Sequence, residues 1–453
     1  MAYAWGRVAL HAALPGAKAG MTLFLRNIHE ESLVKEANLK KKILAVLGVL
    51  MLMLVMFSSC SSGAGAVGWA GVAMYDGSIF TVSGSGQLNV ISPSDPTKDW
   101  AVAISESSDP GFLGCAPASV NIAVYGTPAV AGNYVYVAAY NGKIYVYDLT
   151  THQLVKEAVV LDKDNNQTIV GAPIVSDGVL YIASSNGNVY ALDANSLNLD
   201  RIWKFETKSK IWSTPVLSNG VLFIGSFDKN IYALDAASGE KKWSKSIGGA
   251  MMATPLVASG VVYAVSLDCS IYAFDEQTGD LKWKYPLGGQ NDKKPSEWLW
   301  ATPVLCEGFL YAPCMDGRVY AVNVASPSNV KVFDLDSPIS AAPVVSDGKV
   351  VVASEKGRVY TLDATSGDKG TQRLVLDLRV SDNQPSLTVN SQLCAADGIV
   401  YVHSLRPDIV YAVNVEAATF RRFAMEAVSA NSAGTTVTVT ETVTVPTTVT
   451  VTN

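Results

Sequence analysis

Histidines and cysteines are the first residues to consider for chemistry, because they supply many nucleophiles, proton carriers and metal ligands. From Cys60 to the C-terminus the chain has two histidines, His152 and His403. Two imidazoles are too few for a multi-histidine metal or haem site, and no Gly-x-Ser-x-Gly turn accompanies them. We interpret both histidines as surface or edge residues and predict no catalytic residue.

The cysteines after Cys60 lack the spacing of a functional site. They form no C-x-x-C, C-x-x-C-H or adjacent Cys-Cys motif, and their number is odd. We therefore interpret most of them as small buried residues in strands. These cysteines are Cys115, Cys269, Cys306, Cys314 and Cys394.

One acidic run and the glycines were the remaining candidates for ion and phosphate binding. The run from Asp162 to Asn166 is similar to a calcium loop, but the glycine at the sixth position and the closing glutamate are missing. The glycine-rich dipeptides do not open a helix, so no phosphate-binding loop is predicted. We predict a solvated loop at 162–166, and no metal site.

The composition excludes two further classes of protein. With 49% hydrophobic residues the chain has enough apolar surface to fold, which excludes a mainly disordered chain. A net charge of −6 gives no electrostatic reason to bind nucleic acid. Charged residues make up 16% of the chain, against roughly 25% in an average soluble domain. We therefore expect a sheet-rich body with a surface of Ser, Thr, Asn and Gly.

Residues 40–60 have the pattern of a lipoprotein signal segment. Three lysines precede fifteen mainly apolar residues, 43–57, which is shorter than the roughly 20 of a spanning helix. The Phe-Ser-Ser-Cys ending resembles a bacterial lipobox, in which Cys60 would be lipidated and become the N-terminus, although Phe57 replaces the usual leucine. A plain signal anchor and ordinary cleavage are the alternatives.

This signal segment sets the expected boundaries and location. Residues 1–39 are interpreted as a dispensable or mis-assigned extension, since Met21 is an available start, and 61–66 as a linker. Removing residues 1–59, with seven Lys or Arg and three Asp or Glu, changes the net charge to −10. We expect an acidic, extracytoplasmic protein held at the membrane by a lipid anchor.

Internal repeats organise the rest of the chain. The segment STPVLSNGVLFIGSFDKNIYALDAASGEKKW from Ser213 recurs as ATPLVASGVVYAVSLDCSIYAFDEQTGDLKW from Ala253. Six copies carry a proline at the same place, and two degenerate copies flank them, giving eight units of roughly 45 residues between 67 and 425. The six prolines are Pro128, Pro173, Pro215, Pro255, Pro303 and Pro343.

Each unit has the pattern of a four-stranded antiparallel sheet, with short β-branched and aromatic segments separated by Gly, Asn and Asp turns. Repeats of this length predict an all-β, eight-bladed β-propeller that follows the signal segment. A tyrosine recurs in seven units, from Tyr145 to Tyr411, and we interpret it as packing between blades. The Asp or Asn three residues later is expected to stabilise a turn or strand end.

The repeat resembles the PQQ-binding-like repeat of quinoprotein dehydrogenase-like propellers. That family contains dehydrogenases and also non-enzymatic envelope lipoproteins of the BamB type. The resemblance implies that Trp203, Trp243 and Trp283 pack onto the next blade; the last two are each followed by a Gly-Gly pair. In the family's alcohol dehydrogenases, adjacent cysteines form a disulfide against the quinone, beside Ca²⁺. Here the closest pair, Cys306 and Cys314, is separated by seven residues.

A fold shared by enzymes and scaffolds does not settle function. Since the cysteine pair is missing, we predict no cofactor and a non-catalytic, lipid-anchored scaffold that assembles envelope proteins. The first alternative is a dehydrogenase that oxidises alcohols or sugars with PQQ and Ca²⁺. The second is a carbohydrate-binding surface module.

We expect envelope proteins to bind through the propeller face or the insertion loops, because insertions in repeat proteins collect in loops. The insertion at 290–300 contains Trp298 and Trp300, which we single out as possible partner contacts, with a loop folded over the ring as the alternative. The Thr/Val-rich tail, 426–453, is interpreted as an extended stalk, with an added edge strand as the alternative. The other insertions lie at 104–124, 154–170 and 368–392.

Overall fold

The computed structural model describes residues 68–107, 119–160, 168–196, 198–288, 293–425 and 442–443. By its contacts the chain divides into two compact units, Met1–Ala64 and Gly65–Asn453, and all described residues belong to the second. Cys60, the signal segment, the linker and the acidic run at 162–166 lie outside the described residues. Among the residues described, no helix is long and apolar enough to cross a membrane.

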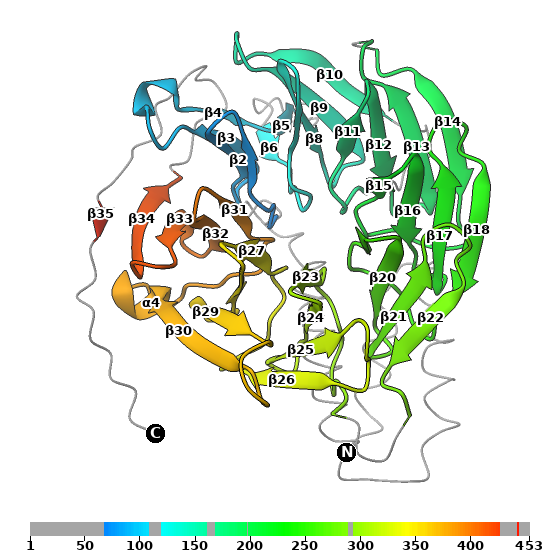
Figure 1. The fold of residues 1–453 in the computed structure, drawn as a ribbon. Coiled ribbons are helices and arrows are strands. Elements are labelled where there is room, and N and C mark those ends of the chain that lie inside the picture. The colour runs from blue at the N-terminus through cyan, green and yellow to red at the C-terminus, as the bar shows by residue number, and fades with distance from the viewer. Residues whose placement is uncertain are drawn as a thin grey trace, which may run out of the picture. The chain divides into compact units, whose positions relative to one another are not determined.

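Eight antiparallel sheets are arranged in a ring, which confirms the predicted eight-bladed propeller (Figure 1). Within each sheet the strands follow one another in the chain, and we number these sheets blades 1 to 8. Blade 1 consists of β1 Ala73–Tyr75, β2 Ser78–Val82, β3 Gln87–Ile91 and β4 Trp100–Ala103, and blade 2 of β7 Ala129–Ala131, β8 Tyr134–Ala138, β9 Lys143–Asp148 and β10 Leu154–Val160. Blade 3 consists of β11 Ile174–Ser176, β12 Val179–Ala183, β13 Asn188–Asp193 and β14 Arg201–Glu206, and blade 4 of β15 Val216–Ser218, β16 Val221–Gly225, β17 Asn230–Asp235 and β18 Lys241–Ser246.

The other four blades repeat this order and complete the ring. Blade 5 consists of β19 Leu256–Ala258, β20 Val261–Ser266, β21 Ser270–Asp275 and β22 Leu281–Tyr285, and blade 6 of β23 Val304–Cys306, β24 Phe309–Pro313, β25 Arg318–Asn323 and β26 Val330–Asp334. Blade 7 consists of β27 Val344–Ser346, β28 Lys349–Ala353, β29 Arg358–Asp363 and β30 Thr371–Asp377, and blade 8 of β31 Cys394–Ala396, β32 Ile399–Leu405, β33 Asp408–Asn414 and β34 Thr419–Ala424. The first strand of each blade lies innermost and contacts the first strand of neighbouring blades.

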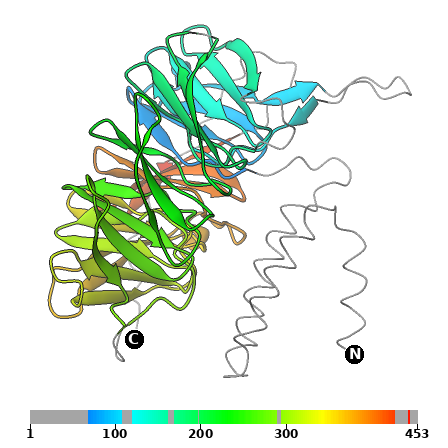
Figure 2. The ribbon, with the colours of Figure 1, turned by 90° about the vertical axis from the view of Figure 1, so that its right-hand side faces the viewer.

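Short elements depart from the four-stranded pattern. The insertion after blade 1 contains a hairpin, β5 Ser105–Ser107 with β6 Ser119–Asn121, which extends beyond the sheets in Figure 2. Blade 8 has a fifth strand, β35 Thr442–Val443, which pairs with β34. For these two residues the structure therefore has the edge strand that was the alternative to a stalk. Two one-turn helices, η1 Pro96–Lys98 and α4 Leu378–Ser381, complete the elements of the described residues.

The turn between the first two strands of a blade shows why the repeat forms tight hairpins. In blade 4, Asn219 and Gly220 have φ angles of 49° and 72°, and Ser218 pairs with Val221. Two successive left-handed residues are the signature of a type I′ turn, whose twist matches that of the flanking strands. The Asx-Gly pairs that recur through the sequence therefore set the register of the inner hairpins.

The core is divided among the interfaces between neighbouring blades. Eight buried apolar clusters lie at the eight interfaces, one for each pair of neighbours. The cluster that joins blade 8 to blade 1 includes Ile79, Ile91, Tyr401, Val410 and Phe423. Because blades 1 and 8 come from opposite ends of the described chain, side-chain packing at this interface closes the ring.

The predicted docking tryptophans have different surroundings. The indole Nε1 of Trp203 donates to the carbonyl oxygen of Ala236 at 2.9 Å, and that of Trp243 donates to Glu276 at 3.1 Å. Each ring lies against a glycine of the next blade, Gly239 or Gly279, where a Cβ would approach the ring to 2.6 Å. Trp283 packs against the apolar cluster between blades 5 and 6 and, like the other two, contacts an aromatic ring of its own blade, Tyr263, at 5.9 Å, but its Nε1 has no hydrogen-bond partner among the described residues.

The repeated tyrosine, and the aspartate three residues after it, both make hydrogen bonds. The sequence predicted a polar role for the aspartate but only packing for the tyrosine. The hydroxyl of Tyr232 donates to Asp228 Oδ2 at 2.6 Å, and Tyr272 and Tyr320 make the same bond to Asp268 and Asp316. These tyrosines therefore hold the turn between the second and third strands as well as packing between blades. The later aspartate accepts hydrogen bonds from backbone nitrogens of the following turn, as expected.

In blade 5 the turn carboxylate is that of Asp275. Its Oδ1 accepts from the backbone nitrogens of Gln277 and Thr278, both at 3.0 Å. The hydrogen bond from Thr278, followed by the interaction with Lys282, lowers the pKa of Asp275 to about 2. The ionised carboxylate therefore caps the turn between the third and fourth strands.

Candidate functional site

The axis of the ring contains a cavity of about 430 Å³. The residue before each repeat proline lines it in several blades, together with residues of the innermost strands β11 and β15. The side chains there are small, polar or aliphatic, and the lining residues carry no formal charge. They are Ala172, Ile174, Val175, Ser176, Thr214, Pro215, Val216, Leu217, Thr254, Thr302 and Gln392.

Two kinds of loop lie around one end of this cavity. In an antiparallel blade, the loop that enters the first strand and the turn between the second and third strands lie at the same end. In seven blades a residue at the end of the second strand or in that turn donates its backbone N–H to a carbonyl oxygen of the entering loop, at 2.8–3.1 Å. The pairs are Tyr140 to Ala123, Ser185 to Thr168, Phe227 to Lys210, Leu267 to Ala250, Met315 to Trp298, Glu355 to Pro338 and Leu405 to Thr388.

We define the mouth collar as the residues at two repeat positions around this end. One is the residue three before the repeat proline or its equivalent; the other is the donor in the loop-to-turn bond. Apart from Gly84, which is buried, all of them are half-buried. In blade order they are Trp69 and Gly84, Tyr125 and Tyr140, Val170 and Ser185, Trp212 and Phe227, Met252 and Leu267, Trp300 and Met315, Ser340 and Glu355, Asn390 and Leu405.

Aromatic side chains of the mouth collar contact one another within and between blades. The ring of Tyr125 lies 4.5 Å from that of Trp69 in blade 1 and 5.1 Å from that of Tyr140 in its own blade, centroid to centroid. Trp212 contacts Phe227 at 4.9 Å. Burial raises the pKa of Tyr125 to about 12, so its hydroxyl stays neutral at physiological pH. These edge-on pairs form a rigid apolar surface that remains partly open to solvent.

The collar changes character in blades 7 and 8, where Ser340, Glu355 and Asn390 replace apolar residues. Burial raises the pKa of the Glu355 carboxyl, and the nearby Ser340 Oγ is buried with no hydrogen-bond partner among the described residues. The backbone nitrogen of Val389 donates to the Glu355 carbonyl oxygen at 3.1 Å, which holds Asn390 beside this residue. We call these three residues the polar sector of the mouth collar.

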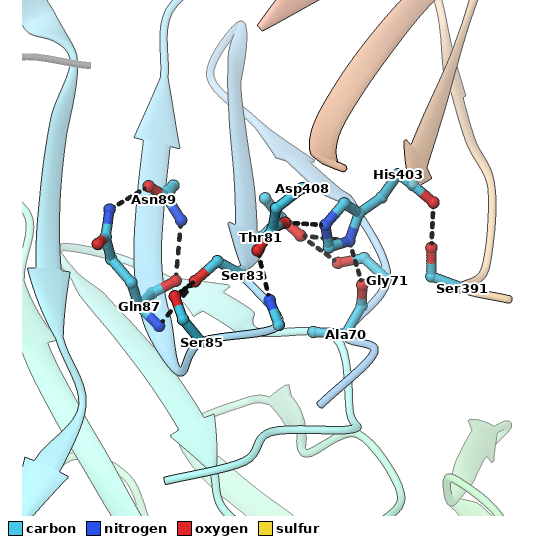
Figure 3. Close-up of polar contacts among 11 residues, drawn as sticks. Ala70, Gly71, Thr81, Ser83, Ser85, Gln87, Asn89, Ser391, His403 and Asp408 are labelled. Atoms are coloured by element: carbon cyan, nitrogen blue, oxygen red, sulfur yellow. Dashed lines mark hydrogen bonds and ion pairs between the residues drawn. The ribbon is translucent and has the colours of Figure 1, made fainter. Parts of the chain in front are cut away.

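Blade 1 follows no described blade, and a side-chain network replaces its loop-to-turn bond (Figure 3). The Gly84 nitrogen donates to Asp408 Oδ2 at 2.7 Å. Asp408 Oδ1 lies 2.8 Å from His403 Nε2, and His403 Nδ1 lies 2.9 Å from the carbonyl oxygen of Ala70. Both imidazole nitrogens therefore face oxygen atoms, and the network joins blade 8 to blade 1.

The interpretation of the histidines was right for one and wrong for the other. His152 is exposed and stacks on Trp100, with ring centroids 4.7 Å apart. His403 is fully buried at the interface of blades 8 and 1, because its partners come from the other end of the repeat array. Comparison of the repeats does not predict this burial, since the other blades have no histidine at the position.

The two tryptophans singled out in the insertion have separate places. Trp300 occupies the mouth collar at the repeat position of Trp69, Tyr125 and Trp212, so it belongs to the repeat and not to the inserted loop. Trp298 precedes it, and its carbonyl oxygen accepts from Met315. Comparing the residue three places before each repeat proline would have identified this position of the collar from the sequence. Contact of either tryptophan with a partner stays a prediction.

The described residues do not fit the quinone and calcium of the alcohol dehydrogenases. Cys306 and Cys314 are both free thiols, buried in or next to β23 and β24. The carboxylates of Asp228, Asp268 and Asp316 are held by tyrosine hydroxyls. Within the described part of the chain, no three His, Cys, Asp or Glu side chains are grouped as metal ligands. Whether the protein uses a cofactor stays a prediction.

Comparison with known proteins gives a family and a fold. The family model described as outer membrane protein assembly factor BamB matches residues 116–198 and 197–422, which is more than half of the chain. BamB from Moraxella catarrhalis is 18% identical over 74% of this chain and 91% of its own, with a TM-score of 0.53. The computationally designed Ika8 protein is 16% identical over 77% of this chain and 96% of its own, with a TM-score of 0.57.

At these identities the solved structures show the fold alone. No curated protein matches the sequence. The family model spans blades 2 to 8, so it includes all six blades that carry the repeat proline. The chain therefore belongs to the BamB family of PQQ-like β-propellers.

Proposed function

We propose that this protein is a non-catalytic scaffold of the cell envelope, anchored to a membrane through lipidated Cys60, which docks envelope proteins on the mouth collar. The mouth collar carries the proposal. It presents half-buried aromatic and aliphatic side chains at matching positions of successive blades. The family description, an assembly factor for outer membrane proteins, supports a role in assembling other proteins.

The physical argument rests on rigidity and composition. Tryptophan and tyrosine are enriched among residues that dominate binding energy, and rigid aromatic groups lose little conformational entropy on binding. The loop-to-turn bonds and the ring contacts of Trp69, Tyr125 and Trp212 hold the collar in one arrangement. A protein partner that covers the collar would therefore gain apolar burial without first ordering its receptor.

Site-directed photocrosslinking in membranes tests the scaffold. Replacing Trp300 with a benzophenone amino acid should yield discrete crosslinked proteins. The same replacement at Ala237, an exposed residue in a turn at the opposite end of blade 4, should yield far fewer. Equal labelling at both positions, or none at Trp300, would contradict docking on the collar.

Two further measurements test the anchor and the rival functions. Cys60→Ser should release the protein from membranes, whereas retention of the variant would refute lipidation. Saturable binding of PQQ in the presence of Ca²⁺ would favour the dehydrogenase instead. Binding to a glycan array without protein crosslinks would favour the carbohydrate-binding module.

A further inference from the structure

Five lysines on the loops of blades 4 to 6 make no side-chain contact that the fold requires. Lys208 and Lys210 precede β15, Lys229 lies in the turn between β16 and β17, and Lys293 and Lys294 precede β23. All five are exposed, and among the described residues none of their ammonium groups has an ion-pair or hydrogen-bond partner. We call these five residues the basic rim.

The backbone of the basic rim is held at the mouth end of the ring. The carbonyl oxygen of Lys210 accepts from the backbone nitrogen of Phe227 at 2.9 Å, in the loop-to-turn bond of blade 4. The carbonyl oxygen of Lys294 accepts from the hydroxyl of Tyr320 at 3.1 Å. The lysines therefore stand at fixed places around one end, while their charged groups remain open to a ligand.

Lysines at the opposite end of the same blades are neutralised instead. Lys242 pairs with Asp235 at 3.2 Å, and blade 5 repeats this ion pair in the turn between its third and fourth strands. The described loops of the basic rim contain five lysines against two acidic residues, Asp228 and Glu297. Positive charge is therefore in excess at this end of blades 4 to 6, although the whole chain is negative.

Apolar groups lie among these lysines. Leu287, in the same connection between β22 and β23 as Lys293, is 52% exposed. The half-buried Trp212 and Phe227 of the mouth collar are each two residues from a lysine of the basic rim. Lysines beside aromatic and aliphatic side chains are typical of surfaces that meet phospholipid headgroups, because the apolar groups enter the boundary of the acyl chains.

The chain enters the propeller at the same end. The backbone nitrogen of Gly68 donates to the carbonyl oxygen of Gly84 at 3.3 Å, and Trp69 belongs to the mouth collar. Cys60 precedes Gly68 by eight residues, which span at most about 28 Å when fully extended. A lipid on Cys60 would therefore keep the entry of the propeller close to the membrane surface.

We propose that the basic rim is a docking surface for anionic phospholipid headgroups, which turns the mouth end of the anchored protein towards its membrane. An ammonium group acts as a compact point charge, and the surface of an anionic membrane attracts clustered lysines. The acidic turns lie at the other end of six-residue strands such as β17, about 20 Å away. This distance exceeds the screening length of about 8 Å in physiological salt, so their repulsion is weak.

A lipid surface fits these observations better than an acidic polypeptide. The lysines belong to loops of blades 4 and 6, with blade 5 between them, so the occupant must be broad and evenly charged. A membrane has both properties and is near when Cys60 is lipidated. The inference uses the anchor of the proposed function but not its docking of proteins, because the collar of the other blades carries no residue of the basic rim.

The test uses the full-length protein, reconstituted through its own N-terminal segment into vesicles of phosphatidylcholine, alone or mixed in equal parts with phosphatidylglycerol. A fluorescent amino acid at Ser246, exposed at the mouth end of β18, reports contact through quenching by a nitroxide on the lipid headgroups. The same label at Ala237 reports the opposite end. We expect phosphatidylglycerol to increase quenching at 246 and not at 237, and added salt to reverse the increase.

Two triple variants separate the basic rim from net charge. Lys208→Gln, Lys210→Gln and Lys229→Gln together should lower the ratio of docked to undocked protein by at least about tenfold, because each lysine near an anionic surface adds to the attraction. Lys241→Gln, Lys242→Gln and Lys282→Gln remove the same charge from exposed positions at the opposite end and should leave docking unweakened.

Equal quenching at 246 in the two kinds of vesicle would overturn the docking surface, as would equal losses in two triple variants that keep the thermal transition of the parent. If polyglutamate binds the parent and not the rim variant while lipid charge has no effect, an acidic polypeptide is the occupant and the membrane proposal fails. Protein crosslinks at Trp300 that persist without lipid docking would leave the scaffold standing. Lipid docking without such crosslinks would remove the scaffold alone.

Discussion

The interface between blades 4 and 5 and the interface between blades 8 and 1 solve the same packing problem with different residues. Between blades 4 and 5, Trp243 spans the gap, donates to Glu276 and lies on Gly279. Between blades 8 and 1, the buried pair His403 and Asp408 makes the polar connection to Ala70 and Gly84. Residues of the repeat therefore connect blades within the array, and residues outside the repeat pattern connect its two ends.

This difference has an energetic consequence. The tryptophan contact adds one neutral hydrogen bond to a large apolar cluster that also contains Phe223 and Phe274. The His403 network satisfies several polar groups that apolar packing alone would leave unpaired. Loss of one partner should therefore be more costly at the closing interface than at the regular one.

The largest effect is expected at His403. His403→Ala should lower the free energy of unfolding by about 3 kcal/mol, because it leaves Asp408 and the carbonyl oxygen of Ala70 without their buried partner. Denaturant titration followed by circular dichroism measures this change. His152→Ala, at the exposed histidine, should cost less than about 1 kcal/mol. Equal costs for the two variants would contradict a special role for the closing interface.

An intermediate effect is expected at the regular interface. Trp243→Phe keeps an aromatic ring but removes the Nε1 donor to Glu276, and should cost about 1 to 2 kcal/mol. Trp283→Phe is the matched control, because this indole has an equivalent ring contact, with Tyr263, but no Nε1 hydrogen bond among the described residues. Thermal unfolding of the two variants side by side measures the difference. A larger loss in Trp283→Phe than in Trp243→Phe would show that the hydrogen bond is not what distinguishes them.

The smallest effect is expected at a repeated turn, through pH. The lowered pKa of Asp275 means that its contribution to stability is present above the ordinary carboxyl pKa of about 4 and is lost as pH falls towards 2. Asp275→Asn should therefore change stability little at pH 7 and reduce its decline between pH 4 and 2. Asn323 and Asn414, which occupy this position in blades 6 and 8, make the substitution conservative.

Stability measured against pH for both proteins tests the turn. An Asp275→Asn variant with the same acid sensitivity as the parent would show that this carboxylate does not stabilise the folded blade through its charge. Comparison with His403→Ala then shows which contributes more to stability, the repeated turn carboxylate or the network that closes the ring. A single repeated turn is one of several similar ones, whereas the closing network occurs once.

Much of the fold could be predicted because its causes are local. The turn pairs such as Asn219 and Gly220 give the hairpins, and the alternation of apolar residues between them gives the strands. The candidate site was predictable only in part. Trp300 was recognised as a possible contact, but its equivalence with Trp212 and Tyr125 appears when the residues before each proline are followed around the ring.

Other assignments depended on distant residues. Trp203 and Trp243 lie on a glycine of the following blade. The corresponding turn of blade 6 has Ser328 at the place of that glycine, and Trp283 has no hydrogen bond to the next blade among the described residues. The fifth strand of blade 8 pairs two residues of a tail whose composition suited both a stalk and a strand. In each case the partner residue, and not the segment itself, decides the outcome.

The sequence by itself determined the number of blades, their order and the class of fold, because each blade is specified by residues within one repeat. Tertiary structure alone decided which residues meet where repeats differ. His403 and Ala70 lie 333 positions apart, and Glu355 is unusual only because its neighbours around the mouth are apolar. Burial and electrostatic environment depend on the whole ring, and the ring exists only after the two ends of the array have met.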